Sequence, residues 1–340
     1  MANARDWLQL FRSHTSPLEM TITITGSALA VGTIFDLRIL LFLLFGWLYH
    51  NAGYGQNSVE DYLRGYDKDD PNKAHHPIQR GVIDPYTART VCRVLILILF
   101  VYGVIISNFD PISVVLLATL IAMGIVYNLF NKKMTGKFIP IAIAHSLLFP
   151  FAFFGSGGAI DISSAAPYVS GPEAGAALLL FGYLLVQVIY QIMIEGDLKD
   201  IDMDEASLLK EMGVRVREGI LESSPLARGV AFFLKASSVA IIFLVLSTLD
   251  GTVDNYVGAL VFSLLILYLD QKLMGRGPWE HSRCLKTMSL MEVASTFALA
   301  VAITPEIGGW IPALLIMVFN MVYFVMMNRF LWGTVIKPRV

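Results

Sequence analysis

Residues 94–106 read Val-Leu-Ile-Leu-Ile-Leu-Phe-Val-Tyr-Gly-Val-Ile-Ile and contain no charged side chain. A second uncharged run follows at residues 111–130, Pro-Ile-Ser-Val-Val-Leu-Leu-Ala-Thr-Leu-Ile-Ala-Met-Gly-Ile-Val-Tyr-Asn-Leu-Phe. A helix needs roughly 20 mainly apolar residues to cross the hydrocarbon core of a bilayer. Because such runs recur almost to the C-terminus, the sequence predicts a membrane protein with many spans and excludes a single anchor.

The composition agrees with this interpretation. Of the 340 residues, 56% are hydrophobic and only 15% are charged, unlike a typical soluble domain. We expect an all-α, polytopic transmembrane helical bundle that forms one integral membrane domain over residues 1–340. Apolar runs bounded by turn residues or charges predict nine or ten helices, at residues 18–35, 37–64, 85–107, 111–130, 138–156, 173–196, 225–248, 254–273, 286–304 and 309–333. The first run, short and rich in Thr and Gly, decides between the two counts.

The positions of lysine and arginine predict the orientation, because these residues collect in short cytoplasmic loops. Neither residue occurs in four of the connections, at residues 107–110, 155–173, 247–255 and 304–309. The alternate connections and the two ends of the chain hold nearly all of them. Both termini are therefore expected on the cytoplasmic side of a cell membrane. The long hydrophilic connections at residues 65–84 and 197–224 are predicted to be cytoplasmic cap loops.

An acidic motif ends the predicted helix 37–64 and continues into the loop that follows it. Asn57 and Asp61 are four residues apart, which places them on one face of a helix. Asp67 and Asp69 come next, and either side chain can fold back toward the same point. The sequence does not decide which of these two aspartates binds metal.

A second acidic motif follows the predicted helix 173–196. Asp197, Asp200 and Asp204 stand at i, i+3 and i+7, so the three carboxylates share one stripe of a helix. In an alternating topology both motifs reach the cytoplasmic side, where they are expected to face each other in an active-site cavity open to that side. Opposed carboxylates repel unless a cation separates them. Two Mg²⁺ ions, which also accept water and phosphate oxygens, would suit sparse clusters bridged by a diphosphate.

Together these motifs resemble the UbiA-type intramembrane prenyltransferases, whose pattern is Asn-x-x-x-Asp with further acids on one helix and Asp-x-x-Asp-x-x-x-Asp on another. The resemblance covers most of the chain. Besides the acids it includes Asn72, Lys73, Pro77, Gly81 and the segment 127–132. Two departures concern positions that face the diphosphate in the family. His76 stands where many members have an arginine before the proline, and Leu208 lies near the place of a glycine.

The motifs and the resemblance together predict the site residues. The metal ligands are predicted among Asn57, Asp61, Asp67, Asp69, Asp197, Asp200 and Asp204. The diphosphate contacts are predicted at Lys73, Arg80, Tyr127, Lys132, Lys133 and Lys199, because lysine and arginine supply positive charge to phosphate oxygens. Catalytic roles are assigned to Asp61, Asp200 and Asp204.

The resemblance implies a Mg²⁺-dependent prenyltransferase. A polyprenyl diphosphate would ionise to an allylic carbocation within the bilayer, release diphosphate and pass its prenyl group to a hydrophobic acceptor. Family acceptors include quinone precursors, chlorophyll precursors, haem and a glycerol-phosphate lipid, and the sequence does not choose among them. No nucleic-acid partner is expected.

Two other functions are considered. A terpene cyclase on the same scaffold would quench the cation with the double bond of its own substrate, and the departures at His76 and Leu208 leave this alternative open. A cation-coupled transporter would use the acids as an ion site. Transporter sites usually lie near the bilayer midplane on broken helices, whereas these acids lie at predicted helix ends, which favours the enzyme.

Overall fold

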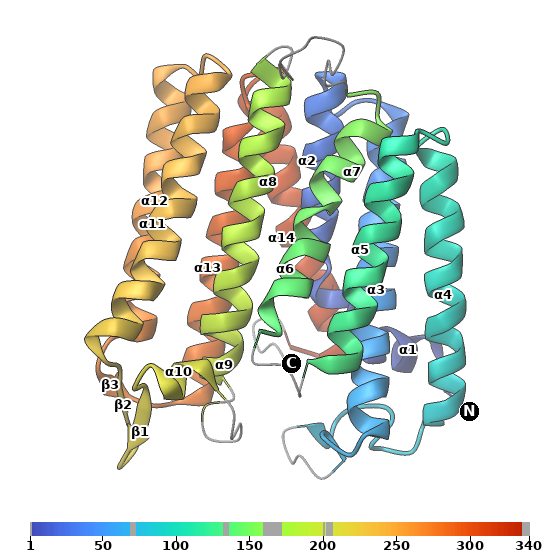
Figure 1. Ribbon diagram of the computed structural model, residues 1–340, viewed down its shortest axis with the longest axis vertical. Coiled ribbons are helices and arrows are strands. Elements are labelled where there is room, and N and C mark those ends of the chain that lie inside the picture. Colours follow the sequence, from blue (N-terminus) through green and yellow to red (C-terminus); the bar gives the residue numbers. More distant parts are fainter. Residues whose placement is uncertain are drawn as a thin grey trace. The chain divides into compact units, whose positions relative to one another are not determined.

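The architecture is seen in a computed structural model that describes residues 2–68, 73–131, 136–158, 172–199, 201 and 207–334. The chain divides into two compact units. The first comprises Met1–Asn131, Leu147–Gly158 and Leu315–Val340, and the second comprises Lys132–Ser146 and Ala159–Leu314. Helices make up most of both units (Figure 1), which confirms the predicted all-α class.

Helix α3 is the central helix of the first unit. The elements of this unit are α1 (Ala4–Leu10), the 3-10 turn η1 (Ser13–Thr15), α2 (Pro17–Val31), α3 (Leu37–Leu63), α4 (Pro85–Ile106), α5 (Pro111–Phe130), α7 (Leu148–Gly155) and the larger part of α14 (Trp310–Trp332). Helix α3 packs against α2, α4 and α5, and α7 packs against α2 and α5 (Figure 1). The end of α3, which carries the first acidic motif, is therefore held by several neighbours.

The second unit is organised around α8 and α11, which pack closely along their length (Figure 1). Its elements are α6 (Phe138–Ser146), α8 (Pro172–Tyr190), the π-helical turn η3 (Gln191–Gly196), α9 (Asp197–Lys199), α10 (Leu208–Glu211), β1 (Arg215–Arg217), β2 (Ile220–Glu222), α11 (Pro225–Thr248), α12 (Val253–Met274), β3 (Gly277–Pro278), α13 (His281–Ala302) and the first turn of α14. Helix α12 packs against α11 and α13. The three strands form a small antiparallel sheet in the order β1-β2-β3.

Several long helices begin with a polar cap followed by proline. The side chains of Asp84, Asp110 and Ser224 accept hydrogen bonds from backbone N–H groups in the first helical turn, at 2.7 to 3.1 Å. Pro85, Pro111 and Pro225 then occupy the first helical position. A cap residue satisfies an otherwise unpaired N–H group, and proline is tolerated there because its missing N–H has no partner in the helix. These pairs fix where α4, α5 and α11 begin.

Helix α2, which corresponds to the least regular predicted run, is a buried helix rich in threonine. Thr23 donates its hydroxyl hydrogen to the carbonyl of Glu19 at 3.1 Å, and Thr25 donates to the carbonyl of Thr21 at 2.8 Å. Each hydroxyl is thus satisfied within its own helix. Gly46 of α3 allows close approach, because a Cβ atom there would lie 2.6 Å from the Thr23 hydroxyl oxygen.

Each of the ten predicted runs contains helix, with two internal changes of geometry. The predicted helix 138–156 is interrupted at Leu147, between α6 and α7. Pro150 explains the break, since proline cannot donate to the carbonyl of Ser146 and its ring clashes there. The predicted helix 173–196 is α-helical as far as Tyr190 and then continues as the π-helical turn η3.

The outer faces of the helices suit contact with lipid. By length and apolar composition, eight helical segments of the described chain can cross a membrane. Large apolar side chains such as Leu97 on α4 and Leu264 on α12 are exposed, which is the arrangement expected of a multi-pass membrane protein. The cytoplasmic position of the termini and of the loops 65–84 and 197–224 stays a prediction.

Candidate functional site

The first acidic motif places Asn57 and Asp61 side by side near the end of α3. The Asn57 amide donates to Asp61 Oδ2 at 3.1 Å, as their spacing on one helical face predicts. Asp61 is only 3% exposed. Asn131, directly after α5, donates its amide hydrogen to Asn57 Oδ1 at 3.0 Å. The start of the motif is therefore fixed by two helices of the first unit.

The chain turns back toward Asp61 directly after α3. Gly65 has a φ of +84°, a left-handed conformation that glycine adopts without strain. The N–H of Tyr66 donates to the backbone carbonyl of Asp61 at 3.0 Å. Asp67 is buried, and Lys73 Nζ lies 2.7 Å from its Oδ2 atom. Of the two loop aspartates, Asp67 thus folds back toward the motif, while Asp69 lies outside the described residues.

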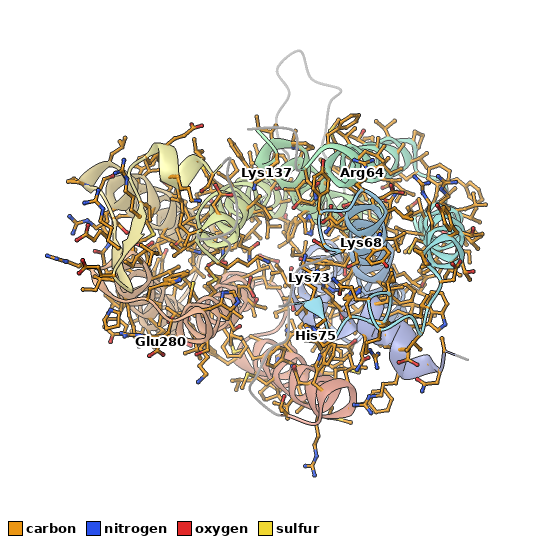
Figure 2. The ribbon with its side chains drawn as sticks, turned by 90° about the horizontal axis from the view of Figure 1, so that it is seen from below. Arg64, Lys68, Lys73, His75, Lys137 and Glu280 are labelled. Atoms are coloured by element: carbon orange, nitrogen blue, oxygen red, sulfur yellow. The ribbon has the colours of Figure 1, made fainter. Side chains whose placement is uncertain are left out.

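Several cationic side chains accompany this loop. Figure 2 looks onto the end of the first unit where α3 finishes, and shows Arg64, Lys68 and Lys73 on that end. The Arg64 guanidinium donates to the carbonyl of Leu129 on α5. Arg80 donates to side-chain oxygens of two residues of the N-terminal helix α1, Asp6 at 3.0 Å and Gln9 at 2.9 Å, and its contact with a diphosphate stays a prediction.

The segment that ends α5 reaches the same place. Tyr127 is half-buried in the last turn of α5, and its carbonyl accepts from the N–H of Asn131 at 2.8 Å. Because Asn131 also binds Asn57, the end of α5 is tied to the first motif. Lys132 and Lys133 lie outside the described residues, so their contact with a diphosphate stays a prediction.

In the second unit, Asp197 directly follows the turn η3 and is 2% exposed. Its Oδ2 atom accepts from the backbone N–H of Leu208 at 2.8 Å and from the Ser207 hydroxyl at 3.1 Å. Its Oδ1 atom lies 2.9 Å from Lys137 Nζ. The buried carboxylate is therefore compensated by a cation and two hydrogen bonds. Leu208, the residue that departs from the family pattern, takes part through its backbone.

The other members of the second motif are less completely placed. Lys199 ends α9, and its backbone carbonyl lies 3.2 Å from His281 Nδ1. Asp200 and Asp204, to which the sequence assigns catalytic and metal-binding roles, lie outside the described residues.

Three contributors were missed by the sequence reasoning. Lys137 belongs to neither motif, and its pairing with Asp197 joins positions 60 apart in the chain. Asn131 and Ser207 are polar residues with no motif of their own. A signal existed for Asn131, because it lies within the segment 127–132 that the family resemblance already includes.

His76 contributes no positive charge near Lys73. Burial, reinforced by the neighbouring charges of Arg12 and Lys73, lowers the pKa of His76 to about 3. The imidazole is therefore neutral at physiological pH, whereas the arginine found at this place in many family members is always charged.

The described donor atoms fit magnesium. The candidate ligands in both units present carboxylate or amide oxygens, which hard divalent cations prefer. Asp67 and Asp197 are buried beside the ammonium groups of Lys73 and Lys137, so each position already favours a positive charge. In the described part of the chain, no group of three or more His, Cys, Asp or Glu side chains is arranged to hold a metal ion alone. Mg²⁺ commonly completes its shell with water and substrate oxygens.

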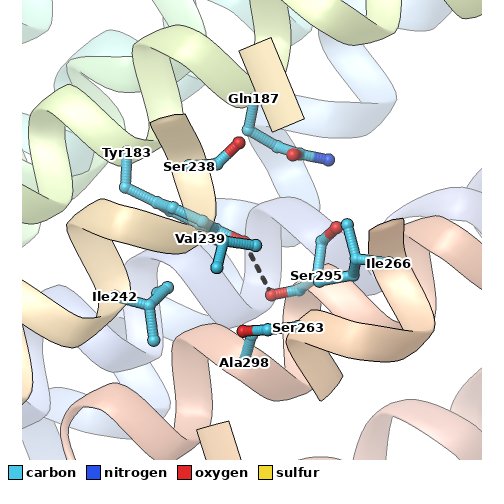
Figure 3. A pocket seen from close by; sticks show the side chains of 9 residues that line it. All are labelled: Tyr183, Gln187, Ser238, Val239, Ile242, Ser263, Ile266, Ser295 and Ala298. Atoms are coloured by element: carbon cyan, nitrogen blue, oxygen red, sulfur yellow. Dashed lines mark hydrogen bonds between the residues drawn. The ribbon is translucent and has the colours of Figure 1, made fainter. Parts of the chain in front are cut away.

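A cavity inside the second unit is too small to hold a prenyl chain. It measures about 10 Å³, and its lining is mainly apolar, with polar side chains such as Tyr183 and Gln187 beside apolar ones such as Ile242 and Ile266. Figure 3 shows these side chains converging from separate helices, with the Tyr183 hydroxyl donating to the carbonyl of Ser295 at 2.9 Å. A volume of this size holds about one water molecule.

The fold and these residues define a multi-pass helical membrane protein with buried, lysine-paired carboxylates after α3 and after the π-helical turn that extends α8. The sequence profile of the UbiA prenyltransferase family matches residues 20–290. The chain belongs to this family, and the predicted resemblance is confirmed. None of the curated proteins is a significant sequence match.

Solved structures share the fold at low sequence identity. A structure described as giving insight into digeranylgeranylglyceryl phosphate synthase in membranes is 16% identical, with a TM-score of 0.64, and the match covers 91% of this chain and 100% of that one. An apo UbiA homologue from Aeropyrum pernix K1 is 14% identical, with a TM-score of 0.59 and coverage of 90% and 96%. An Archaeoglobus fulgidus UbiA homologue bound to GPP and Mg²⁺ is 16% identical, with a TM-score of 0.56 and coverage of 88% and 99%.

Proposed function

We propose that this protein transfers the prenyl group of a prenyl diphosphate to a hydrophobic acceptor within the membrane, with the help of Mg²⁺. Family membership supports prenyl transfer, and a homologue of the same fold binds GPP and Mg²⁺. The observation that carries the proposal is the pairing of buried carboxylates with lysines, Asp67 with Lys73 and Asp197 with Lys137. Such pairs supply both oxygen ligands for a metal and cations for a phosphate.

We infer that both acidic motifs act on one diphosphate. The metal ions would be held by residues from each motif, namely Asn57, Asp61, Asp67, Asp69, Asp197, Asp200 and Asp204. When bound, Mg²⁺ supplies Lewis-acid stabilisation of the negative charge on the leaving diphosphate. Lys73 and Lys137, which are paired with carboxylates, would then also donate hydrogen bonds to phosphate oxygens.

The chain's own groups support the bond changes as follows. The prenyl C–O bond breaks, and its electron pair leaves with the diphosphate. Lys73 and Lys137 stabilise that growing charge by donating hydrogen bonds to the departing oxygens. The acceptor attacks the allylic carbon and afterwards loses a proton.

A terpene cyclase remains a second candidate, favoured by the neutral His76. Because the pKa of His76 is about 3, this side chain lacks the positive charge that many family members place beside the diphosphate. Product analysis without an acceptor separates the two functions. A cyclic hydrocarbon or alcohol, formed at a rate that added acceptors do not change, would identify the cyclase.

The proposal is tested with purified protein in lipid nanodiscs. Prenyl diphosphates of several chain lengths are supplied with Mg²⁺ and a panel of acceptors, and diphosphate release is measured. Asp61→Asn, which removes one charge at nearly constant shape, should reduce the rate at least about 100-fold, the size expected when a group that stabilises the transition state is lost. Asp110→Asn is the matched control, because asparagine also caps the start of α5. Equal rates for wild type and Asp61→Asn would refute the proposed site.

A further inference from the structure

A π-helical turn lies directly before the second acidic motif. Helix α8 ends at Tyr190, the turn η3 occupies Gln191–Gly196, and Asp197 follows. A π-helical turn adds one residue relative to a straight α-helix and is found often at functional sites. One residue corresponds to a rotation of about 100° at 3.6 residues per turn. The turn therefore decides which way Asp197 faces.

Ionisable side chains from two other helices contact Tyr190, the residue directly before the turn. The hydroxyl of Tyr190 donates to Asp270 Oδ1 on α12 at 2.7 Å. Lys235 Nζ on α11 lies 3.9 Å from the centre of the Tyr190 ring, and it donates to Gln187 Oε1 at 2.9 Å. Lys235 also interacts electrostatically with Glu195, which is buried within the turn.

The ionisable side chains of Lys235 and Asp270 gain no contact with water where they lie. Both Lys235 and Asp270 are 0% exposed, so both side chains are buried among the helices of the second unit. Lys235 lies ten residues after Pro225, about 15 Å along the helix at 1.5 Å per residue. Ionisable groups at such depth are costly and mark functional sites. Apolar side chains could make a purely structural contact at a smaller desolvation cost.

We propose that Lys235, Tyr190 and Asp270 are positioning residues that hold the π-helical turn η3 and thereby aim the Asp197 carboxylate. The inference rests on the proposed function, in which Asp197 binds the metal and diphosphate. The three residues act through the helix and touch neither substrate nor metal. Without the contacts of Tyr190 with Asp270 and Lys235, the turn is free to relax toward ordinary α-helix. Asp197 then rotates away from its contacts with Lys137 and Leu208.

The test compares two single hydroxyl deletions on the same helix. Tyr190→Phe removes the hydrogen bond to Asp270, and Tyr183→Phe removes the hydrogen bond to the Ser295 carbonyl, two helical turns before Tyr190. Hydrogen–deuterium exchange is followed over residues 191–199, and Mn²⁺ affinity is measured by electron paramagnetic resonance. A hydrogen bond to a charged group is worth enough to change a local equilibrium by about tenfold. Tyr190→Phe should therefore speed exchange in this segment about tenfold and weaken Mn²⁺ binding, whereas Tyr183→Phe should do neither.

A second comparison uses two substitutions of Asp270, one that keeps the size of the side chain and one that removes it. Asp270→Asn keeps an oxygen acceptor for Tyr190 and should retain slower exchange in residues 191–199 than Asp270→Ala. Unchanged exchange in Tyr190→Phe, or equal effects of Tyr190→Phe and Tyr183→Phe, would overturn the inference. Failure of the wild-type protein to release diphosphate would refute the proposed function alone, because the exchange comparison needs no catalysis.

Discussion

Removing the ammonium group of Lys137 should reveal how strongly the second motif depends on a nearby cation. Lys137 Nζ lies 2.9 Å from Asp197 Oδ1, and the two side chains are 20% and 2% exposed. In Lys137→Met the hydrogen bonds from Leu208 and Ser207 are the contacts that the described residues leave to the buried carboxylate. It therefore becomes an uncompensated charge in the folded state.

The expected size follows from that burial. Breaking a fully buried ion pair costs about 3–5 kcal/mol, whereas an exposed pair is worth about 0–1 kcal/mol. Because Lys137 is partly accessible and Asp197 retains two hydrogen bonds, we expect Lys137→Met to lower the free energy of unfolding by about 2 kcal/mol. In Asp197→Asn the same lysine substitution should cost much less, since the charge that needed compensation is gone.

A double-mutant cycle measures this coupling. The free energy of unfolding is determined in bicelles for wild type, Lys137→Met, Asp197→Asn and the double variant, with Lys286→Met as a control at an exposed lysine. The coupling should be about 1–2 kcal/mol without divalent cations. It should shrink when Mg²⁺ and a diphosphate are added, because the ion then supplies the positive charge. A coupling near zero without Mg²⁺ would refute the reasoning.

Three further predictions follow from separate features. His14 has its pKa lowered to about 3, mainly by burial, so between about pH 6.5 and pH 3 the unfolded chain binds more protons than the folded one. Thermal stability should therefore fall as the pH drops through this window, and His14→Gln should flatten the fall; an unchanged slope would contradict the assignment. Gly46→Ala should lower the free energy of unfolding by about 2 kcal/mol, a typical cost of overpacking. The new Cβ would lie 2.7 Å from the carbonyl oxygen of Glu19. A free energy of unfolding equal to that of wild type would show that α2 and α3 separate easily. Chelation of divalent cations should abolish diphosphate release and added Mn²⁺ should restore it, while turnover that persists with chelator would argue against metal dependence.

Most of the fold could be predicted from hydrophobic runs and turn residues, because a bilayer imposes a minimum apolar length on each span. The break at Leu147 was also encoded locally, since Pro150 removes a backbone donor in the middle of an apolar run. The turn η3 was not predictable in this way. Its residues have no unusual local propensity, and its start is held by Lys235 and Asp270, which come from distant parts of the chain.

The site follows the same division between local and long-range contacts. The contact of Asn57 with Asp61 follows from their helical spacing, and the return of Asp67 follows from a short loop with Gly65. By contrast, the contacts of Arg80 could not be predicted from the sequence. Its partners on α1 lie more than 70 positions away, so its engagement with Asp6 emerges only in three dimensions.

The account depends on carboxylates from both motifs binding the same ions around one diphosphate. Mn²⁺ affinity measured with a non-reactive thio-diphosphate analogue, in wild type, Asp61→Asn, Asp197→Asn and the double variant, tests this directly. A shared site predicts that each single substitution removes most of the analogue-dependent Mn²⁺ binding and that the second adds little. Independent, additive losses of affinity from the two substitutions would contradict it.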